Sequence, residues 1–116
     1  MNRIVAVCIL IGAVFPAAAD EVQEVKNDYP TAARAEFVLG CMGANGQTPE
    51  MLRKCSCSID FIASIIPYEK YVRMETVLRL QQLSGDRGGL YRSTPWAKAL
   101  IEELGTTQAE ATLKCF

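Results

Sequence analysis

Two cysteines separated by a single residue constrain the fold of this chain more than any other feature. Cys55 and Cys57 lie in the largely apolar run RKCSCSIDFIASII, which covers residues 53–66. Each residue of an α-helix is turned by about 100° from the one before, so these two side chains point in nearly opposite directions. A disulfide requires converging Cβ vectors, and we therefore expect the two cysteines to bond to different partners rather than to each other.

The N-terminus has the pattern of a secretory signal peptide over residues 1–19. Asn2 and Arg3 precede an apolar run over residues 4–15, and Pro16 and three alanines follow it. We expect cleavage after Ala19, because small residues stand where signal peptidase reads the chain. The apolar run is too short to span a bilayer. No stable membrane anchor is therefore expected after cleavage, and the protein is predicted to be periplasmic or secreted.

Cleavage removes Cys8 and leaves an even number of cysteines, Cys41, Cys55, Cys57 and Cys115. In a short exported chain this predicts a disulfide framework. We favour the pairs Cys41–Cys55 and Cys57–Cys115, because a short connection makes the first two helices an antiparallel hairpin. The pairs Cys41–Cys57 and Cys55–Cys115 stay open as an alternative, since the sequence does not determine the register of the hairpin.

The rest of the chain predicts an all-α fold, a small bundle of four to five short helices stapled by two disulfides. A polar arm is expected over residues 20–30, and a single helical domain over residues 31–116. Helices are predicted over residues 31–42, 49–66, 68–83 and 95–104, with a restart over residues 107–115 after a glycine. The expected apolar stripes are Ala35, Val38, Leu39 and Met42 in the first helix, and Leu52, Cys55, Ile59, Ile62 and Ile66 in the second. Ion pairs Glu69–Arg73 and Glu75–Arg79 are expected on the third.

The four cysteines also suggest a metal site or a redox site, but the pattern favours neither. Cys55 and Cys57 could hold Cu(I) or exchange disulfides as a C-x-C pair. However, the chain has no C-x-x-C spacing and no histidine. Because the two side chains also diverge on a helix, we expect no metal and no cofactor.

Catalytic groups are equally hard to place, because histidine, the usual general base, does not occur. Asp60 lies between Ile59 and Phe61 in the apolar helix, which makes it a candidate buried carboxylate. If it is inside, it must be paired or hydrogen-bonded, and Arg34 or Arg92 would serve. We therefore expect no catalytic residue.

The segment SGDRGGLYRSTP, residues 84–95, is the best sequence candidate for a working surface. It offers Asp86, Arg87, Tyr91 and Arg92 among glycines, in what we expect to be a flexible loop. Such a loop can contact a partner or an anion through arginines and backbone N–H groups, although it has no phosphate-binding motif. The plainer interpretation is a helix connection whose arginines pair with local acids. Tyr68, Tyr71, Tyr91 and Trp96 are candidates to line a groove for a partner.

Three segments resemble a group of short exported bacterial proteins of uncharacterised function. They are FVLGCM with the following Asn45-Gly46, the motif CSCSID over residues 55–60, and the closing AEATLKCF over residues 109–116. The resemblance covers about residues 35–116. It implies export, helices and disulfides, and it supplies no catalytic residue.

We therefore expect a non-catalytic binding or accessory factor that acts on another periplasmic protein. The alternative is a thiol-disulfide or copper-handling protein that uses Cys55 and Cys57, and a small enzyme using Asp60 and the arginines ranks last. The net charge is −1 for the whole chain, which provides no long-range attraction for nucleic acid.

Overall fold

A computed structural model describes residues 28–116 of the chain. These residues form five helices, which confirms the all-α prediction. They are α1 (Thr31–Asn45), α2 (Pro49–Ile65), α3 (Tyr68–Gln81), α4 (Gly85–Ser93) and α5 (Pro95–Cys115). The predicted signal peptide and residues 20–27 of the predicted polar arm lie outside the described part. Within residues 28–116, no helix is both long enough and apolar enough to cross a bilayer.

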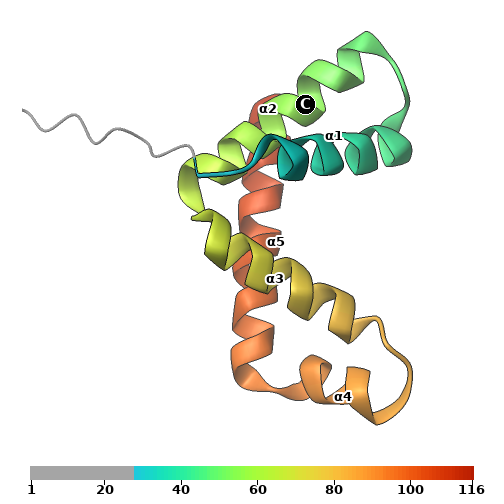
Figure 1. The fold of residues 1–116 in the computed structure, drawn as a ribbon, viewed down its shortest axis with the longest axis vertical. Coiled ribbons are helices and arrows are strands. Elements are labelled where there is room, and N and C mark those ends of the chain that lie inside the picture. The colour runs from blue at the N-terminus through green and yellow to red at the C-terminus, as the bar shows by residue number, and fades with distance from the viewer. Residues whose placement is uncertain (1–27) are drawn as a thin grey trace, which may run out of the picture.

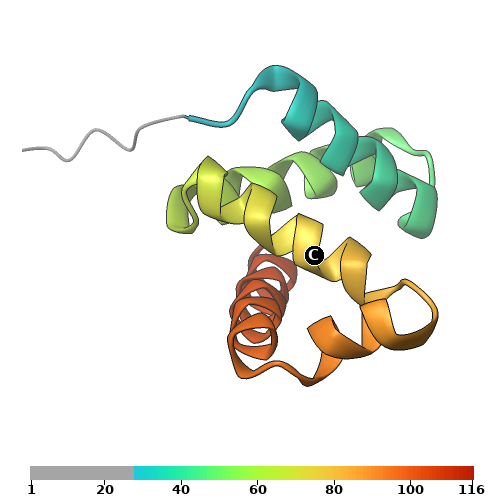
Figure 2. The same cartoon turned by 60° about the horizontal axis from the view of Figure 1, so that its bottom comes forward.

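The longest helix, α5, is the element around which the others are arranged. It runs from α4 at one end of the molecule to α2 at the other, and α3 crosses it (Figure 1). Helices α1 and α2 form an antiparallel hairpin at the end where the chain terminates. The turned view in Figure 2 shows α1 on the outside of this hairpin, away from α5. The C-terminus of α5 is thereby brought back to the middle of α2.

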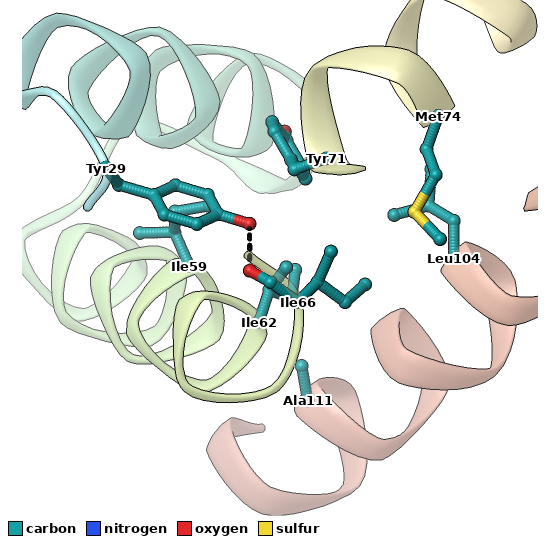
Figure 3. Packing of buried hydrophobic residues seen from close by; sticks show 8 residues of the cluster. All are labelled: Tyr29, Ile59, Ile62, Ile66, Tyr71, Met74, Leu104 and Ala111. Atoms are coloured by element: carbon teal, nitrogen blue, oxygen red, sulfur yellow. Dashed lines mark hydrogen bonds between the residues drawn. The ribbon is translucent and has the colours of Figure 1, made fainter. Parts of the chain in front are cut away.

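The hydrophobic core lies where α2, α3 and α5 meet (Figure 3). The predicted stripe of α2 is confirmed for Cys55, Ile59, Ile62 and Ile66, each at most 1% exposed. Leu52, one turn before the stripe, is 47% exposed because it lies beyond the end of the core. The core cluster comprises Tyr29, Ile59, Ile62, Ile66, Tyr71, Met74, Leu104 and Ala111.

Asp28 and Tyr29, shortly before α1, are fixed by contacts with a distant part of the chain. Tyr29 is only 4% exposed, and its hydroxyl donates a 2.8 Å hydrogen bond to the Ile66 carbonyl at the end of α2. The Asp28 carboxylate accepts a 2.8 Å hydrogen bond from the Tyr68 N–H, which caps the start of α3. The described end of the predicted polar arm is therefore part of the packed structure, because its one aromatic residue fills the core.

The predicted apolar stripe of α1 is correct only in part. Val38 and Met42 are half-buried, whereas Leu39 is 71% exposed and Ala35 is also exposed. The helix packs against the core through Phe37 and Val38, with Cys41 one turn further on. The disulfide sets this rotation, because the face that carries Cys41 must turn toward α2. As a result α1 contributes no fully buried residue.

Two predicted helix boundaries are also corrected. Residues 84–93 do not form a flexible loop, since α4 begins at Gly85, whose φ of 74° suits glycine. The predicted break at Gly105 does not occur, and α5 continues to Cys115. A glycine inside a helix costs only about 1 kcal/mol, and burial of Leu104, Thr107 and Ala111 on the same helix outweighs it. The predicted start of α2 is confirmed, with the Thr48 hydroxyl accepting from the Met51 N–H at 3.1 Å.

The close approach of α4 to the end of α3 is testable. A Cβ atom at Gly88 would lie 1.9 Å from the Leu83 carbonyl oxygen, whereas the nearest atom to a Cβ at Gly89 is 3.9 Å away. We predict that Gly88→Ala destabilises the protein by about 1–3 kcal/mol, because backbone must move to make room. Gly89→Ala should be neutral or stabilising by up to about 1 kcal/mol, since alanine is the better helix former. Urea unfolding of the two variants measures both effects, and equal stabilities would contradict this packing.

Candidate binding groove

Both disulfides are formed, in the favoured pairing. Cys41 bonds to Cys55 and Cys57 bonds to Cys115, each with a Cα–Cα distance of 5.8 Å. The first bond joins α1 to α2, and the second joins the last residue of α5 to the opposite face of α2. All four described cysteines are therefore in disulfides, and Cys55 and Cys57 are not bonded to each other. Nor do residues 28–116 contain any cluster of three or more His, Cys, Asp or Glu side chains suited to a metal ion.

An open groove separates α1 from α3. Its volume is about 750 Å³, and residues of α1, α3 and α5 form its walls. A smaller hollow of about 280 Å³ continues it between α1 and the C-terminal end of α5. Four residues border both spaces: Phe37, Cys41, Asn45 and Gln108. We call the two spaces together the α1 groove. Its larger part is lined by Ala33, Glu36, Phe37, Gly40, Cys41, Ala44, Asn45, Tyr68, Tyr71, Val72, Glu75, Thr76, Arg79 and Gln108.

The groove exists because α1 is held to α2 but is not packed onto α3. Tyr29 anchors the chain just before α1, and the Cys41–Cys55 bond anchors the helix further along. The groove side of α1 carries small residues, Ala33 and Gly40 between the two anchors and Ala44 after the second. Small side chains cannot bridge to α3, so the space between the two helices stays open.

One exposed ion pair and one buried phenol define the electrostatics of the groove. Arg79 of α3 reaches Glu36 of α1 at 3.6 Å, so the pair links the two walls. It replaces the Glu75–Arg79 pair that the sequence predicts, whereas the Glu69–Arg73 pair is confirmed at 3.4 Å. Burial raises the pKa of Tyr71 well above the ordinary phenol value, and the negative charge of Glu75 and its hydrogen bond with the hydroxyl raise it further. Tyr71 is therefore protonated at neutral pH.

The four aromatic residues proposed for a groove separate into two groups. Tyr68 and Tyr71 do line the α1 groove, and both rings lie within 5.3 Å of the Tyr29 ring between centroids. Tyr91 and Trp96 instead pack edge to face against each other at 6.1 Å, between α4 and α5. Helix α4 and the start of α5, which carry these two residues, lie at the end of the molecule opposite the α1–α2 hairpin (Figure 1).

Asp60 is not buried, which corrects the sequence prediction. Its side chain is 68% exposed and forms an ion pair with Arg34 of α1, one of the two partners expected. The physical reason is rotational, because Asp60 falls in the gap between the direction of Ile59 and that of Phe61. The exposed pair adds a polar contact between α1 and α2, on a part of the molecule remote from α4.

The residues of the predicted anion loop have mainly structural surroundings. Arg92 donates to the backbone carbonyls of Gln81 and Leu83, and thus caps the C-terminal end of α3. The Tyr91 carbonyl accepts a 3.0 Å hydrogen bond from the Gln81 side chain. Asp86 and Arg87 are exposed on α4. The segment is thus mainly a short helix between α3 and α5, and Arg92 pairs with carbonyls rather than with acids. Asp60 pairs with Arg34 of α1 instead.

Sequence reasoning missed the α1 side of the groove. Ala33, Phe37, Gly40 and Ala44 follow one another at spacings of 4, 3 and 4, which marks one helix face. This spacing could have identified the face that lines the groove, but the predicted stripe of α1 was Ala35, Val38, Leu39 and Met42. Comparison of this chain with protein-family models, with curated proteins and with solved structures gives no match. The function must be argued from the geometry of this chain alone.

The two buried phenols, Tyr29 and Tyr71, make the stability of the fold depend on pH. Tyr29 and Tyr71 both have pKa values raised chiefly by burial. A phenol whose pKa is higher in the folded state stabilises that state fully below its unfolded pKa of about 10, and this contribution is lost as pH rises further. We predict that the double variant Tyr29→Phe, Tyr71→Phe shows a smaller loss of unfolding free energy between pH 9 and pH 11 than the unaltered protein. Urea unfolding at each pH measures the unfolding free energy, and parallel pH profiles for the two proteins would refute the prediction.

Proposed function

We propose that this protein is an exported, non-catalytic binding factor that receives part of another protein in the α1 groove. The observation that carries the proposal is the groove itself, an open space of about 750 Å³ with Phe37, Tyr68 and Tyr71 in its walls. Phe37 and Tyr68 are partly exposed, and such aromatic side chains in a concave surface are typical of binding sites. The disulfide that borders the groove keeps one wall in place.

Export to the periplasm or the medium is part of the proposal. The signal-peptide pattern over residues 1–19 supports it. The two disulfides of the described part support it independently, because such bonds persist mainly in oxidising compartments. A chain of this size also benefits from such bonds, since its core is small.

The chemistry of the groove supports binding better than catalysis. Tyr71 is protonated at neutral pH, so it is not a general base there. Arg79 is engaged by Glu36, and Asp60 lies on the α1–α2 contact instead of in the groove. The groove thus offers shape, aromatic surface and hydrogen-bonding groups rather than a nucleophile held against a base.

The thiol-disulfide or copper alternative has weaker support. It requires Cys55 and Cys57 to become free thiols, but each is bonded to a different helix and Cys55 is 0% exposed. Opening both bonds would also release α1 and the end of α5. We therefore assign the cysteines a structural role.

A crosslinking experiment in the native host tests the proposed function. The photoreactive amino acid p-benzoylphenylalanine is placed at Ala44, which lines the groove, or at Leu39, which is 71% exposed and does not line it. We predict that the Ala44 variant crosslinks to one discrete exported protein and that the Leu39 variant does not. Mass spectrometry identifies the adduct, and the purified pair should then bind each other. Equal labelling from both positions, or no adduct from Ala44, would contradict the proposal.

A further inference from the structure

The two long walls of the α1 groove have the residue spacing of helix faces that pack on a third helix. On each side, four of the lining residues are separated by 4, 3 and 4 positions. This is the spacing of a stripe that contacts a neighbouring helix along its length. The α1 wall is Ala33, Phe37, Gly40 and Ala44, and the α3 wall is Tyr68, Val72, Glu75 and Arg79.

An occupant of this groove must supply its own backbone hydrogen bonds. Both walls are helices, whose backbone groups are paired internally, so they have no open edge to offer an extended strand. A helical occupant satisfies its own N–H and C=O groups and needs only side-chain contacts. Gly40 and Ala44 let such a helix approach α1 closely, because the distance between packed helices depends on the side chains at their contact.

Glu75 determines which charge the occupant should carry. Its side chain is half-buried in the α3 wall, and its negative charge contributes to the raised pKa of Tyr71. The cation one turn along, Arg79, reaches across to Glu36 instead. Among residues 28–116, no ion pair involves Glu75. A helix that fills the groove removes water from this carboxylate, and a desolvated carboxylate needs a cationic partner.

We propose that the α1 groove binds an amphipathic helix of a partner protein, and that a lysine or arginine at the edge of the apolar face of that helix pairs with Glu75. This inference rests on the proposed function and deepens it by defining the chemical class of the partner. The apolar face packs on Phe37 and Val72, and the cation of the partner lies against Glu75. The Glu36–Arg79 pair is mostly exposed on both sides, so it yields easily when the helix enters.

Synthetic peptides of the length of α1 provide the probe. Each carries a leucine and alanine face with one lysine, placed at successive positions along the edge of that face, and a matched series carries glutamate in place of lysine. Fluorescence anisotropy measures their binding to the purified, disulfide-bonded protein. We expect at least one lysine peptide to bind about tenfold or more tightly than its glutamate match, and Glu75→Gln to remove most of that difference.

The glycines of α1 provide a matched pair of control variants. Gly40 lines the groove and Gly43 does not, and a Cβ atom at either meets nothing within 4 Å. Gly40→Leu should abolish peptide binding, whereas Gly43→Leu should leave it unchanged. Circular dichroism with a thermal melt verifies that each variant is folded.

Each other outcome overturns the inference in a recognisable way. Equal binding of lysine and glutamate peptides, blocked by Gly40→Leu, would show a groove that binds helices without the cation, and the proposed function would stand. Equal weakening by Gly40→Leu and Gly43→Leu would place binding elsewhere. A dimer that Gly40→Leu disperses would make a second copy of this chain the occupant. Absence of binding in both series would refute a helical ligand, while the crosslink from Ala44 reports separately on the proposed function.

Discussion

The two disulfides of α2 point to opposite sides of one helix, and the arrangement of the other elements depends on this. Cys55 binds α1 on one face, and Cys57 binds the end of α5 on the other. Because the two residues are only two positions apart, both attachments are made at nearly the same level of α2. The helix is therefore held between two neighbours at its middle, and its apolar stripe extends from there into the core with α3 and α5.

The attachment of α1 explains why the molecule has a groove. Tyr29 and Cys41 fix this helix to α2, and Phe37 and Val38 provide its packing against the core. None of its residues is fully buried. A helix that is held by a few anchors rather than by a continuous apolar face can stand away from α3. The small residues on its inner face keep the intervening space open to another molecule.

The sequence predicted the parts of the fold that depend on helix periodicity. The opposed directions of Cys55 and Cys57 and most of the α2 stripe follow from rotation about one helix axis. The pairing of the four cysteines depended on the α1–α2 hairpin as well, and the undetermined register of that hairpin left a second pairing open. The burial of Tyr29 could not be predicted in this way, because its partner Ile66 is 37 residues away in the sequence. The rotation of α1 was mispredicted because large apolar residues were given more weight than the disulfide. Gly88 shows a similar limit, since only the tertiary contact with Leu83 explains a glycine there.

Of the candidate site residues, the sequence identified Tyr68 and Tyr71 but not the surface opposite them. Small residues do not by themselves indicate a binding surface. Those of α1 line a groove only because α3 lies nearby and is not contacted by them. Asp60 was a candidate for burial because its two neighbours in sequence are apolar, but its own direction on the helix leaves it exposed. The ion pair with Arg34 was nevertheless anticipated, since that pairing depends on charge and on the α1–α2 hairpin alone.

Hydrogen exchange in two disulfide variants tests the central claim most directly, namely that each bond holds a different helix to α2. One variant is Cys41→Ala, Cys55→Ala and the other is Cys57→Ala, Cys115→Ala, each compared with the unaltered protein by mass spectrometry of peptide fragments. The account predicts that the first variant loses amide protection mainly in residues 31–45, and the second mainly in the last turns of α5. Uniform loss of protection in both variants, or undiminished protection of α1 in the first, would contradict it.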